Sequence, residues 1–370
     1  MWALSAAAGL LSVVTGLLPV SEARDVLARV APILLFLVAV TVLAELAESA
    51  GVFDVAAVRM ARLGRGSVLG LFGLVALLGT ATTVLLSLDT TAVLLTPVVL
   101  SLALRLELNP LPFAFLAVWI ANAASLLLPV SNLTNLLALD RLDVSAATFA
   151  SRMALPAVVA AVGAVLVVGI RFAGSLRGRY VRPEPFRPDD RLQFCVAAVA
   201  CVGFAPAVLL GAPAWAAASV GATVVALAAA VRQRHRLRWA LVPWRLVLLT
   251  TGLFLVVSAV GRHGLDDLLT RLVGPGGSAR VTAAAAAAAN GVNNLPAYLA
   301  LERSTSPGDL PALLVGVNVG PLVLLWGSLA TLLWRERCRA RGVHISARQF
   351  TLLGLAGVPV LLAATVLVLP

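Results

Sequence analysis

The chain has 370 residues, of which 61% are hydrophobic and only 12% are charged, and its mean hydropathy is +1.00. Water-soluble domains are about 45–50% apolar and about 25% charged, so this composition excludes an ordinary soluble protein and predicts an all-α, polytopic membrane protein. The net charge is +11, but the basic residues are concentrated in a few short connections between apolar segments. The charge therefore reports membrane topology and does not predict a nucleic-acid partner.

Apolar segments follow one another along the chain when hydropathy is averaged over about 19 residues. They are residues 4–20, 27–47, 67–86, 90–105, 112–138, 153–171, 192–210, 213–231, 243–260, 279–300, 310–334 and 349–369. Arginine is concentrated in four of the connections, at 59–65, 171–191, 232–245 and 335–348. The positive-inside rule predicts that all four connections lie in the cytoplasm.

Full crossings by every segment would place some of these connections on opposite sides of the membrane. Two stretches are therefore predicted to be re-entrant hairpins, which enter the bilayer and leave it on the same side. The first, 67–105, has the polar sequence SLDTT between its apolar halves, and the second, 279–300, contains NGVNNLP, where Gly, Asn and Pro interrupt a helix. Nine crossings remain, which predicts a multi-pass protein of the cell membrane with a cytoplasmic N-terminus.

The two halves of the chain resemble each other. Residues 122–137 align without gaps with residues 318–333, at a constant offset of 196 residues, and six of the sixteen positions are identical. In each half a hairpin is followed by a long span that polar and small residues interrupt, and then by one plain span. The interrupted spans are 112–138 and 310–334.

In the predicted topology, residues 1–171 begin with a crossing outward and residues 213–370 begin with a crossing inward. We therefore predict two inverted repeats, joined by a cytoplasmic linker and one connecting span at 172–212. Inverted repeats with hairpins and discontinuous helices are the architecture of secondary transporters.

Asp89 is the carboxylate placed deepest in the apolar part of the chain, in the sequence LLSLDTTAVLLTP. Ionisable groups inside a bilayer cost several kcal/mol and usually face a cavity or a partner. Asp89 is either an N-cap of a helix that begins at Thr90, or a group that binds and releases a proton or cation, and capping does not exclude the second role. Glu45 and Glu48 lie near the end of the second span. We interpret them as snorkelling or loop-pairing residues, and a proton relay is the alternative.

Amide, hydroxyl and small residues surround the second hairpin tip and both interruptions. They offer hydrogen bonds to a neutral or anionic hydroxylated solute, although some of them serve close helix packing and a tip of this kind also serves as a plain turn. At the second tip they are Asn290, Asn293 and Asn294; at the interruptions they are Ser125, Ser131, Asn132, Thr134, Asn135, Asn318, Gly320, Gly327, Ser328 and Thr331.

The motifs of enzymes and metal sites are missing from the sequence. The three cysteines form neither a CxxC pair nor a disulfide framework, the three histidines fall in connections, and neither a Walker A nor an HExxH motif occurs. We therefore predict no catalytic residue, no bound metal and no cofactor.

Several sequences spread over both halves resemble one family. They are AESAGVFDVAAVRMARLGRGS, SLDTTAVLLTPVVL, PFAFLAVWIANAASLLLPVSNLTNLLA, NGVNNLPAYLAL and VNVGPLVLLWGSLATLLW. Together, from about Ala44 to Trp334, they resemble the arsenite/antimonite efflux permeases of the ArsB type, within the ion-transporter superfamily. The similarity includes both hairpin tips and both interrupted spans in the right order.

The resemblance implies an elevator-type fold, in which a transport domain of hairpins and broken spans moves against a scaffold that forms a homodimer. It implies export of arsenite or antimonite, as the trivalent hydroxide, in exchange for protons, alone or with a soluble ATPase partner. It also implies that Asp89 couples transport to protons. The substrate-binding positions that it implies are Thr90, Ser131, Asn132, Asn293, Asn294, Gly327 and Ser328. The family often has Asn-Asp-Gly at the first tip, where this chain has Leu88-Asp89-Thr90.

Two alternatives remain. A sodium-coupled carrier of organic or inorganic anions, from the same superfamily, predicts sodium dependence and a cationic residue for the anion, whereas no arginine stands at a hairpin tip. A membrane-embedded enzyme requires a His, Ser/Lys or paired-acid constellation within the spans, and the sequence shows none.

Overall fold

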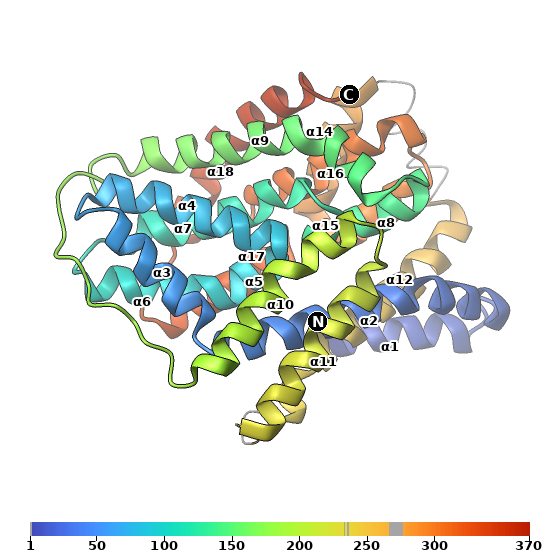
Figure 1. Ribbon diagram of the computed structural model, residues 1–370. Coiled ribbons are helices and arrows are strands. Elements are labelled where there is room, and N and C mark those ends of the chain that lie inside the picture. The colour runs from blue at the N-terminus through green and yellow to red at the C-terminus, as the bar shows by residue number, and fades with distance from the viewer. Residues whose placement is uncertain (1, 233, 235–236, 266–276) are drawn as a thin grey trace.

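The structure is a computed structural model. It describes residues 2–232, 234, 237–265 and 277–370. Over these residues the regular elements are helical, and most helices run side by side in one bundle (Figure 1). Eight of the described helices are long and apolar enough to cross a bilayer. The predicted all-α membrane fold is therefore confirmed.

The first helices are α1 (Trp2–Val14), α2 (Val20–Ser49) and α3 (Val52–Leu63). With 13 residues, α1 is about 20 Å long, less than the roughly 30 Å of a bilayer core. The chain then turns at Gly16, whose φ of 78° favours glycine. The crossing predicted at 4–20 is therefore shorter than a full span.

The first hairpin consists of α4 (Val68–Leu85), α5 (Leu88–Thr90), a π-helical turn (Thr91–Leu95) and α6 (Thr96–Arg105). These elements cover the stretch predicted as a hairpin, 67–105, and both arms end near the middle of the bundle (Figure 1). The wide turn precedes Pro97, which has no N–H to continue the regular ladder of helix hydrogen bonds.

The first interrupted span contains α7 (Leu111–Ala123), a 3-10 turn (Ala124–Leu126) and α8 (Leu133–Leu142), and α9 (Ala146–Arg171) follows it. The predicted span, 112–138, is thus broken in its middle. Between the two helices, Leu128 and Asn132 have extended backbones, and Pro129 lies between them.

The second half contains α14 (Gly277–Val292), α15 (Asn294–Glu302), α16 (Leu310–Val319), a 3-10 turn (Gly320–Leu322), α17 (Leu329–Ala340) and α18 (Ala347–Val366). The stretch predicted as a hairpin, 279–300, corresponds to α14 and α15. The predicted interrupted span, 310–334, corresponds to α16 and α17. Helix α17 begins 196 residues after α8, which is the offset of the sequence alignment. The division into inverted repeats remains a prediction.

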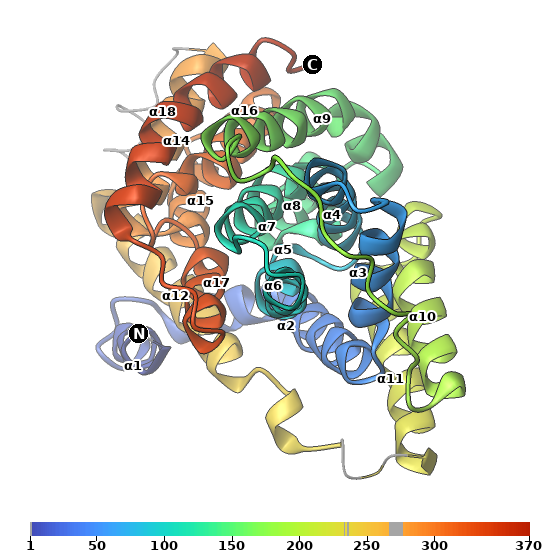
Figure 2. The same ribbon diagram turned by 90° about the vertical axis from the view of Figure 1, so that its left-hand side faces the viewer.

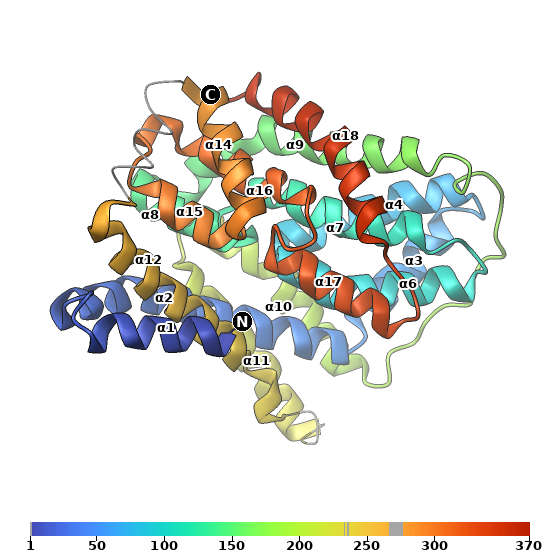
Figure 3. The same cartoon turned by 180° about the vertical axis from the view of Figure 1, so that it is seen from behind.

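Five helices form a layer along one side of the bundle, which we call the wall. It consists of α1, α2, α10 (Arg191–Leu209), α11 (Ala214–Arg232) and α12 (Trp244–Val260), which packs on both α1 and α2. The hairpins, the broken spans, α3, α9 and α18 form the rest of the bundle, which we call the hairpin body. In Figure 2, α1 and α2 lie below this body and α10 and α11 lie along its right side, and Figure 3 shows α1 and α2 below α14, α15 and α16.

The core lies in the hairpin body. Nearly all residues of α7 and α16 are buried, and Phe115, Trp334 and Phe350 form an aromatic cluster between α7, α17 and α18. Small residues allow close helix contact: a Cβ on Gly320 would overlap Ala286 of the alanine run in α14, and a Cβ on Gly252 of α12 would overlap the backbone of Ser5 in α1. The alanine run therefore serves packing.

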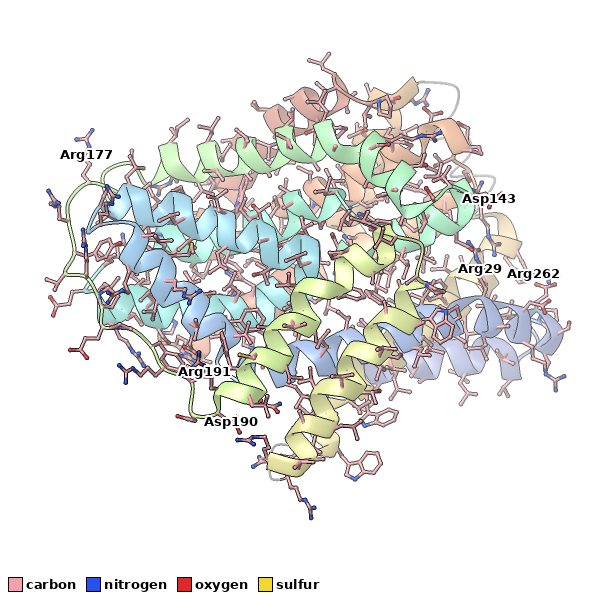
Figure 4. All side chains as sticks on the ribbon, viewed as in Figure 1. Arg29, Asp143, Arg177, Asp190, Arg191 and Arg262 are labelled. Carbon is pink, nitrogen blue, oxygen red and sulfur yellow. The ribbon has the colours of Figure 1, made fainter. Side chains whose placement is uncertain are left out.

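Three of the arginine-rich connections, 59–65, 171–191 and 335–348, lie at the same end of the bundle (Figure 1). Figure 4 shows Arg177 at this end, whereas Arg29, Asp143 and Arg262 lie at the opposite end. We call the first the arginine end and the second the far end. The fourth arginine-rich connection, 232–245, lies partly outside the described residues.

Candidate functional site

The first hairpin turns at Ser87. Its φ of 148° lies in the region that favours glycine, and its Oγ accepts a hydrogen bond from the backbone N–H of Thr90 (3.3 Å). Ser87 is therefore the cap of the helix that runs from Leu88 to Arg105, and the interpretation of Asp89 as the cap is wrong. Asp89 lies in the first turn of that helix, where the helix dipole favours a carboxylate.

The second hairpin turns at Asn293, which has a φ of 85°. Asparagine side chains fasten this tip to the break between α16 and α17. Asn290 donates from Nδ2 to the backbone oxygen of Gly320 (2.7 Å) and accepts at Oδ1 from the N–H of Leu324 (2.9 Å). Asn293 donates from Nδ2 to the backbone oxygen of Trp326 (3.0 Å). The tip and the break thus form one unit.

Each half-helix after a break starts with a polar cap. Asn132 caps α8 by accepting from the N–H of Thr134 (3.3 Å), and Ser328 caps α17 by accepting from the N–H of Thr331 (3.1 Å). Both caps are buried, so neither is a surface turn. Because a helix start carries a partial positive charge, each break presents a favourable place for an oxygen-rich or anionic group.

Asn318, at the end of α16, joins the two broken spans. Its Oδ1 accepts from Nδ2 of Asn132 (2.8 Å) and from Oγ1 of Thr134 (2.9 Å), while its Nδ2 donates to Oδ1 of Asn135 (2.8 Å). All four side chains are buried. A satisfied buried polar network of this kind fixes the relative position of the groups that it joins.

The two tips and the two breaks meet at a small cavity of about 40 Å³, which we call the inner site. Its polar lining residues are Asp89 of the first tip, Asn132 of the first break, Asn293 and Asn294 of the second tip, and Thr250 of α12. Leu329, the first residue of α17, completes the set of four helix starts. The structure therefore brings together four of the eight predicted site residues here.

The other four predicted residues have different positions. Thr90 lines the larger cavity described below. Ser131 is buried and donates to the backbone oxygen of Val84 (3.2 Å), and Ser328 caps α17. A Cβ on Gly327 would overlap Pro321, so glycine permits the tight turn of the second break. These three shape the breaks without lining either of the two cavities described here.

A cavity of about 640 Å³ lies beside the inner site, between the hairpin body and the wall, and we call it the vestibule. It shares Asp89 and Asn132 with the inner site. Its charged lining residues are Asp89, Glu45 of α2 and Arg245 of α12. The carboxylate of Asp89 makes no hydrogen bond or ion pair with any residue that the structure describes. It is half-buried and is thus available to a solute or a proton.

Comparison with known proteins agrees with this architecture. The family model described as "Citrate transporter" matches residues 1–307. The "Arsenical pump membrane protein" of Yersinia enterocolitica is 30% identical over 341 residues, covering 84% of this chain and 79% of that protein. The protein of the same name from Escherichia coli (strain K12) is 29% identical over 340 residues, with the same coverage. The chain belongs to this family of arsenical pump membrane proteins and to the citrate transporter family.

A solved structure has the same fold. The Alcanivorax borkumensis YdaH transporter superposes with a TM-score of 0.55 at 16% identity, covering 94% of this chain and 86% of that one. The expected ion-transporter fold is therefore confirmed, as is the resemblance to arsenite/antimonite efflux permeases at the level of the family. This member of the family is a multi-pass membrane transporter.

Sequence reasoning missed several residues that line the vestibule, among them Trp2, Thr41 and Arg245, and did not place Glu45 there. The sequence did contain one signal for part of this lining. Residues 37, 41 and 45 recur at a spacing of four and therefore share one face of α2. Glu45 therefore belongs to a cavity wall, and it also interacts electrostatically with Arg337 of the connection 335–348, which agrees with its interpretation as a loop-pairing residue.

Proposed function

We propose that this transporter exports arsenite and antimonite, as trivalent hydroxides, across the cell membrane in exchange for protons. The observation that carries the proposal is the unpartnered carboxylate of Asp89 in a cavity where four helix starts and three asparagines meet. The names of the relatives support the choice of substrate.

The chemistry of the inner site suits a small, neutral hydroxide. Its hydroxyl groups can donate to the carboxylate of Asp89 and to amide oxygens, and its oxygen atoms can accept from amide N–H groups and from helix starts. When Asp89 takes up a proton, it loses part of its acceptor capacity. Substrate and proton then compete for one group, which is the requirement for exchange. Hydrogen bonds also allow release, whereas thiolates would hold a thiophilic metalloid firmly.

The proposed orientation places the arginine end in the cytoplasm, in accordance with the positive-inside rule. Glu45 lies on the part of α2 that leads to this end, and Arg245 is the last residue of the arginine-rich connection 232–245. The vestibule would then admit solutes from the cytoplasm, and the N-terminus, next to Trp2 of the vestibule wall, would be cytoplasmic.

Movement of the hairpin body against the wall would expose the inner site on the other side. One ion-pair cluster crosses between the two at the far end: Arg29 of α2 contacts Glu302 of α15 (3.0 Å) and Asp140 of α8 (3.4 Å). A homodimer through the wall and a soluble ATPase partner also form part of the proposal, as implied by the family.

A sodium-coupled anion carrier is the second candidate. The citrate transporter family model and the four helix starts favour it, because helix starts attract anions. The carboxylate of Asp89 opposes it, since an ionised carboxylate repels an anionic substrate. Arg245 lines the vestibule but not the inner site.

Everted membrane vesicles distinguish the two candidates. We expect arsenite uptake into vesicles that contain the protein to require a proton gradient and to be independent of sodium. Citrate and other dicarboxylates should not compete with arsenite. Uptake that requires sodium and ignores the proton gradient would contradict the proposal and favour the anion carrier.

A further inference from the structure

The vestibule is much larger than the proposed inorganic substrate requires. Its volume is about 640 Å³, which lies within the range of roughly 300–1,000 Å³ that is typical of pockets for drug-sized organic ligands. A metalloid trihydroxide has only four non-hydrogen atoms, and a water molecule occupies about 30 Å³ of liquid. The trihydroxide would therefore fill only a small part of this space.

Most of the vestibule wall is apolar. Side chains from α2, the first hairpin, α12 and α17 supply it, including Leu37, Val40, Val93, Leu246 and Leu333. Such a surface offers no hydrogen bonds to a hydrated inorganic solute. It favours a ligand with an apolar body, because burial of apolar area is favourable in proportion to that area.

The vestibule shares two polar groups with the inner site, Asp89 and Asn132. Its lining also includes Trp2 and Trp244, which are partly exposed. Glu45 lies eight residues beyond Leu37 on α2, or about 12 Å along the helix. A ligand that fits this pattern has one polar head, similar to the inorganic hydroxide, and an aromatic or aliphatic body.

We infer that the vestibule accepts the organic group of trivalent aryl arsenicals, so that the transporter carries arylarsonous acids as well as arsenite. The inference rests on the proposed function, since the As(OH)₂ head would use the inner site as arsenite does. The ring would lie against the apolar wall. Cysteine is absent from the described residues that line the vestibule, so the head would be held by hydrogen bonds and could be released.

The probe is phenylarsonous acid, offered to everted vesicles beside labelled arsenite, with vesicles that lack the protein as the baseline. We expect uptake of both compounds to depend on the proton gradient. Phenylarsonous acid should compete with arsenite and show a KM lower by about tenfold, because its ring buries apolar area. The background is a Cys195→Ser variant, which removes the exposed thiol as an adventitious arsenic ligand.

A wider side chain in the vestibule wall tests where the ring lies. Thr41 lines the vestibule, and its hydroxyl bonds to the backbone of its own helix. Thr41→Trp should lower phenylarsonous acid uptake at least about tenfold while arsenite uptake changes less than about twofold. Thr41→Val, which keeps the width of the vestibule, is the matched control. Leu333→Trp narrows the vestibule from α17 and should act in the same way.

The outcomes separate the two proposals. Transport of arsenite without transport of phenylarsonous acid would overturn the inference and leave the proposed function standing. Transport of neither compound by correctly inserted protein would overturn the proposed function. Uptake of phenylarsonous acid that ignores both tryptophan variants would overturn the vestibule as its site, and would favour a lipid chain as the occupant of this cavity.

Discussion

The two hairpin tips are similar in backbone and different in their hydrogen bonding. Each has a residue other than glycine with positive φ, Ser87 in the first and Asn293 in the second. The second tip is fastened to the neighbouring break through Asn290, Asn293 and the indole N–H of Trp326. The first tip is held mainly by bonds within the hairpin, and its carboxylate is unpartnered among the described residues. The second tip is thus fixed in place by hydrogen bonds, whereas the first tip carries the carboxylate that can bind and release a proton.

The largest effect is expected from Asp89→Asn. The amide keeps the size of the carboxylate but cannot exchange a proton, so proton-driven arsenite uptake should fall to the level of vesicles without the protein. The protein should still insert and fold. Asp143→Asn, at the far end and at the end of α8, is the matched control and should transport normally. Normal uptake by Asp89→Asn would remove this residue from the coupling.

Removal of the fastening at the second tip should have the next largest effect. Asn290→Ala leaves the backbone oxygen of Gly320 and the N–H of Leu324 without their partner, at a cost of about 1–3 kcal/mol for each group that stays dry. Thermal unfolding in detergent should start at a lower temperature, and the transport rate should fall. Asn109→Ala removes an exposed asparagine that bonds to Ser175 and to the N–H of Leu111, so it should lower the unfolding temperature less and leave the transport rate unchanged. Equal unfolding temperatures and equal transport rates for the two variants would contradict the claim that these hydrogen bonds hold the second tip in place.

Removal of the ion pairs between the wall and the hairpin body should have a moderate effect on transport. Arg29→Gln removes the guanidinium that contacts both the buried Glu302 and the exposed Asp140. Arg141 and Arg303 remain as cations that act on Glu302. We expect a change of a few-fold in KM with little change in the amount of folded protein, since the pair links the two groups of helices that we propose to move relative to each other. Arg262→Gln, which breaks an exposed pair with Glu22 inside the wall, is the control.

The smallest effect is expected from Asp190→Asn. Unlike the carboxylate of Asp89, the carboxylate of Asp190 has an arginine and backbone N–H groups as partners. The guanidinium of Arg232 and the N–H groups of Leu192 and Gln193 hold the pKa of Asp190 below its ordinary value. A lowered pKa adds stability above the ordinary value for aspartate, about 3.9, and this contribution is lost as the pH falls through the lowered pKa.

This pH dependence is measurable by thermal unfolding. Wild type should unfold at a slightly higher temperature than Asp190→Asn near pH 7, and the difference should shrink as the pH falls below about 4. A difference that stays constant down to pH 3 would show that the cap acts through shape alone.

Much of the fold followed from the sequence because hydrophobicity and arginine placement leave few topologies. The hairpin at 67–105 and the interruption after Ala123 both coincide with polar or proline-containing stretches, which cannot continue as plain helices in lipid. The residue that caps the helix after the first hairpin tip could not be predicted in this way. Both Ser87 and Asp89 are good capping residues, and only the backbone turn decides between them.

The site was predictable in part for a similar reason. Asp89, Asn132, Asn293 and Asn294 stand out because polar groups are rare in apolar spans. The vestibule was not predictable, because its wall comes from α2 and α12, which composition alone does not place next to the hairpin tips. The partner of Asn132 across the bundle, Asn318, likewise depends on how α8 and α16 pack.

Proton movement in liposomes tests the central claim most directly. Purified protein is reconstituted with a pH-sensitive dye inside, and arsenite is then added outside at equal pH on both sides. We predict that arsenite influx drives proton efflux through wild type and through Asp143→Asn, and that Asp89→Asn shows no proton movement. Proton efflux of wild-type size through Asp89→Asn would contradict the account.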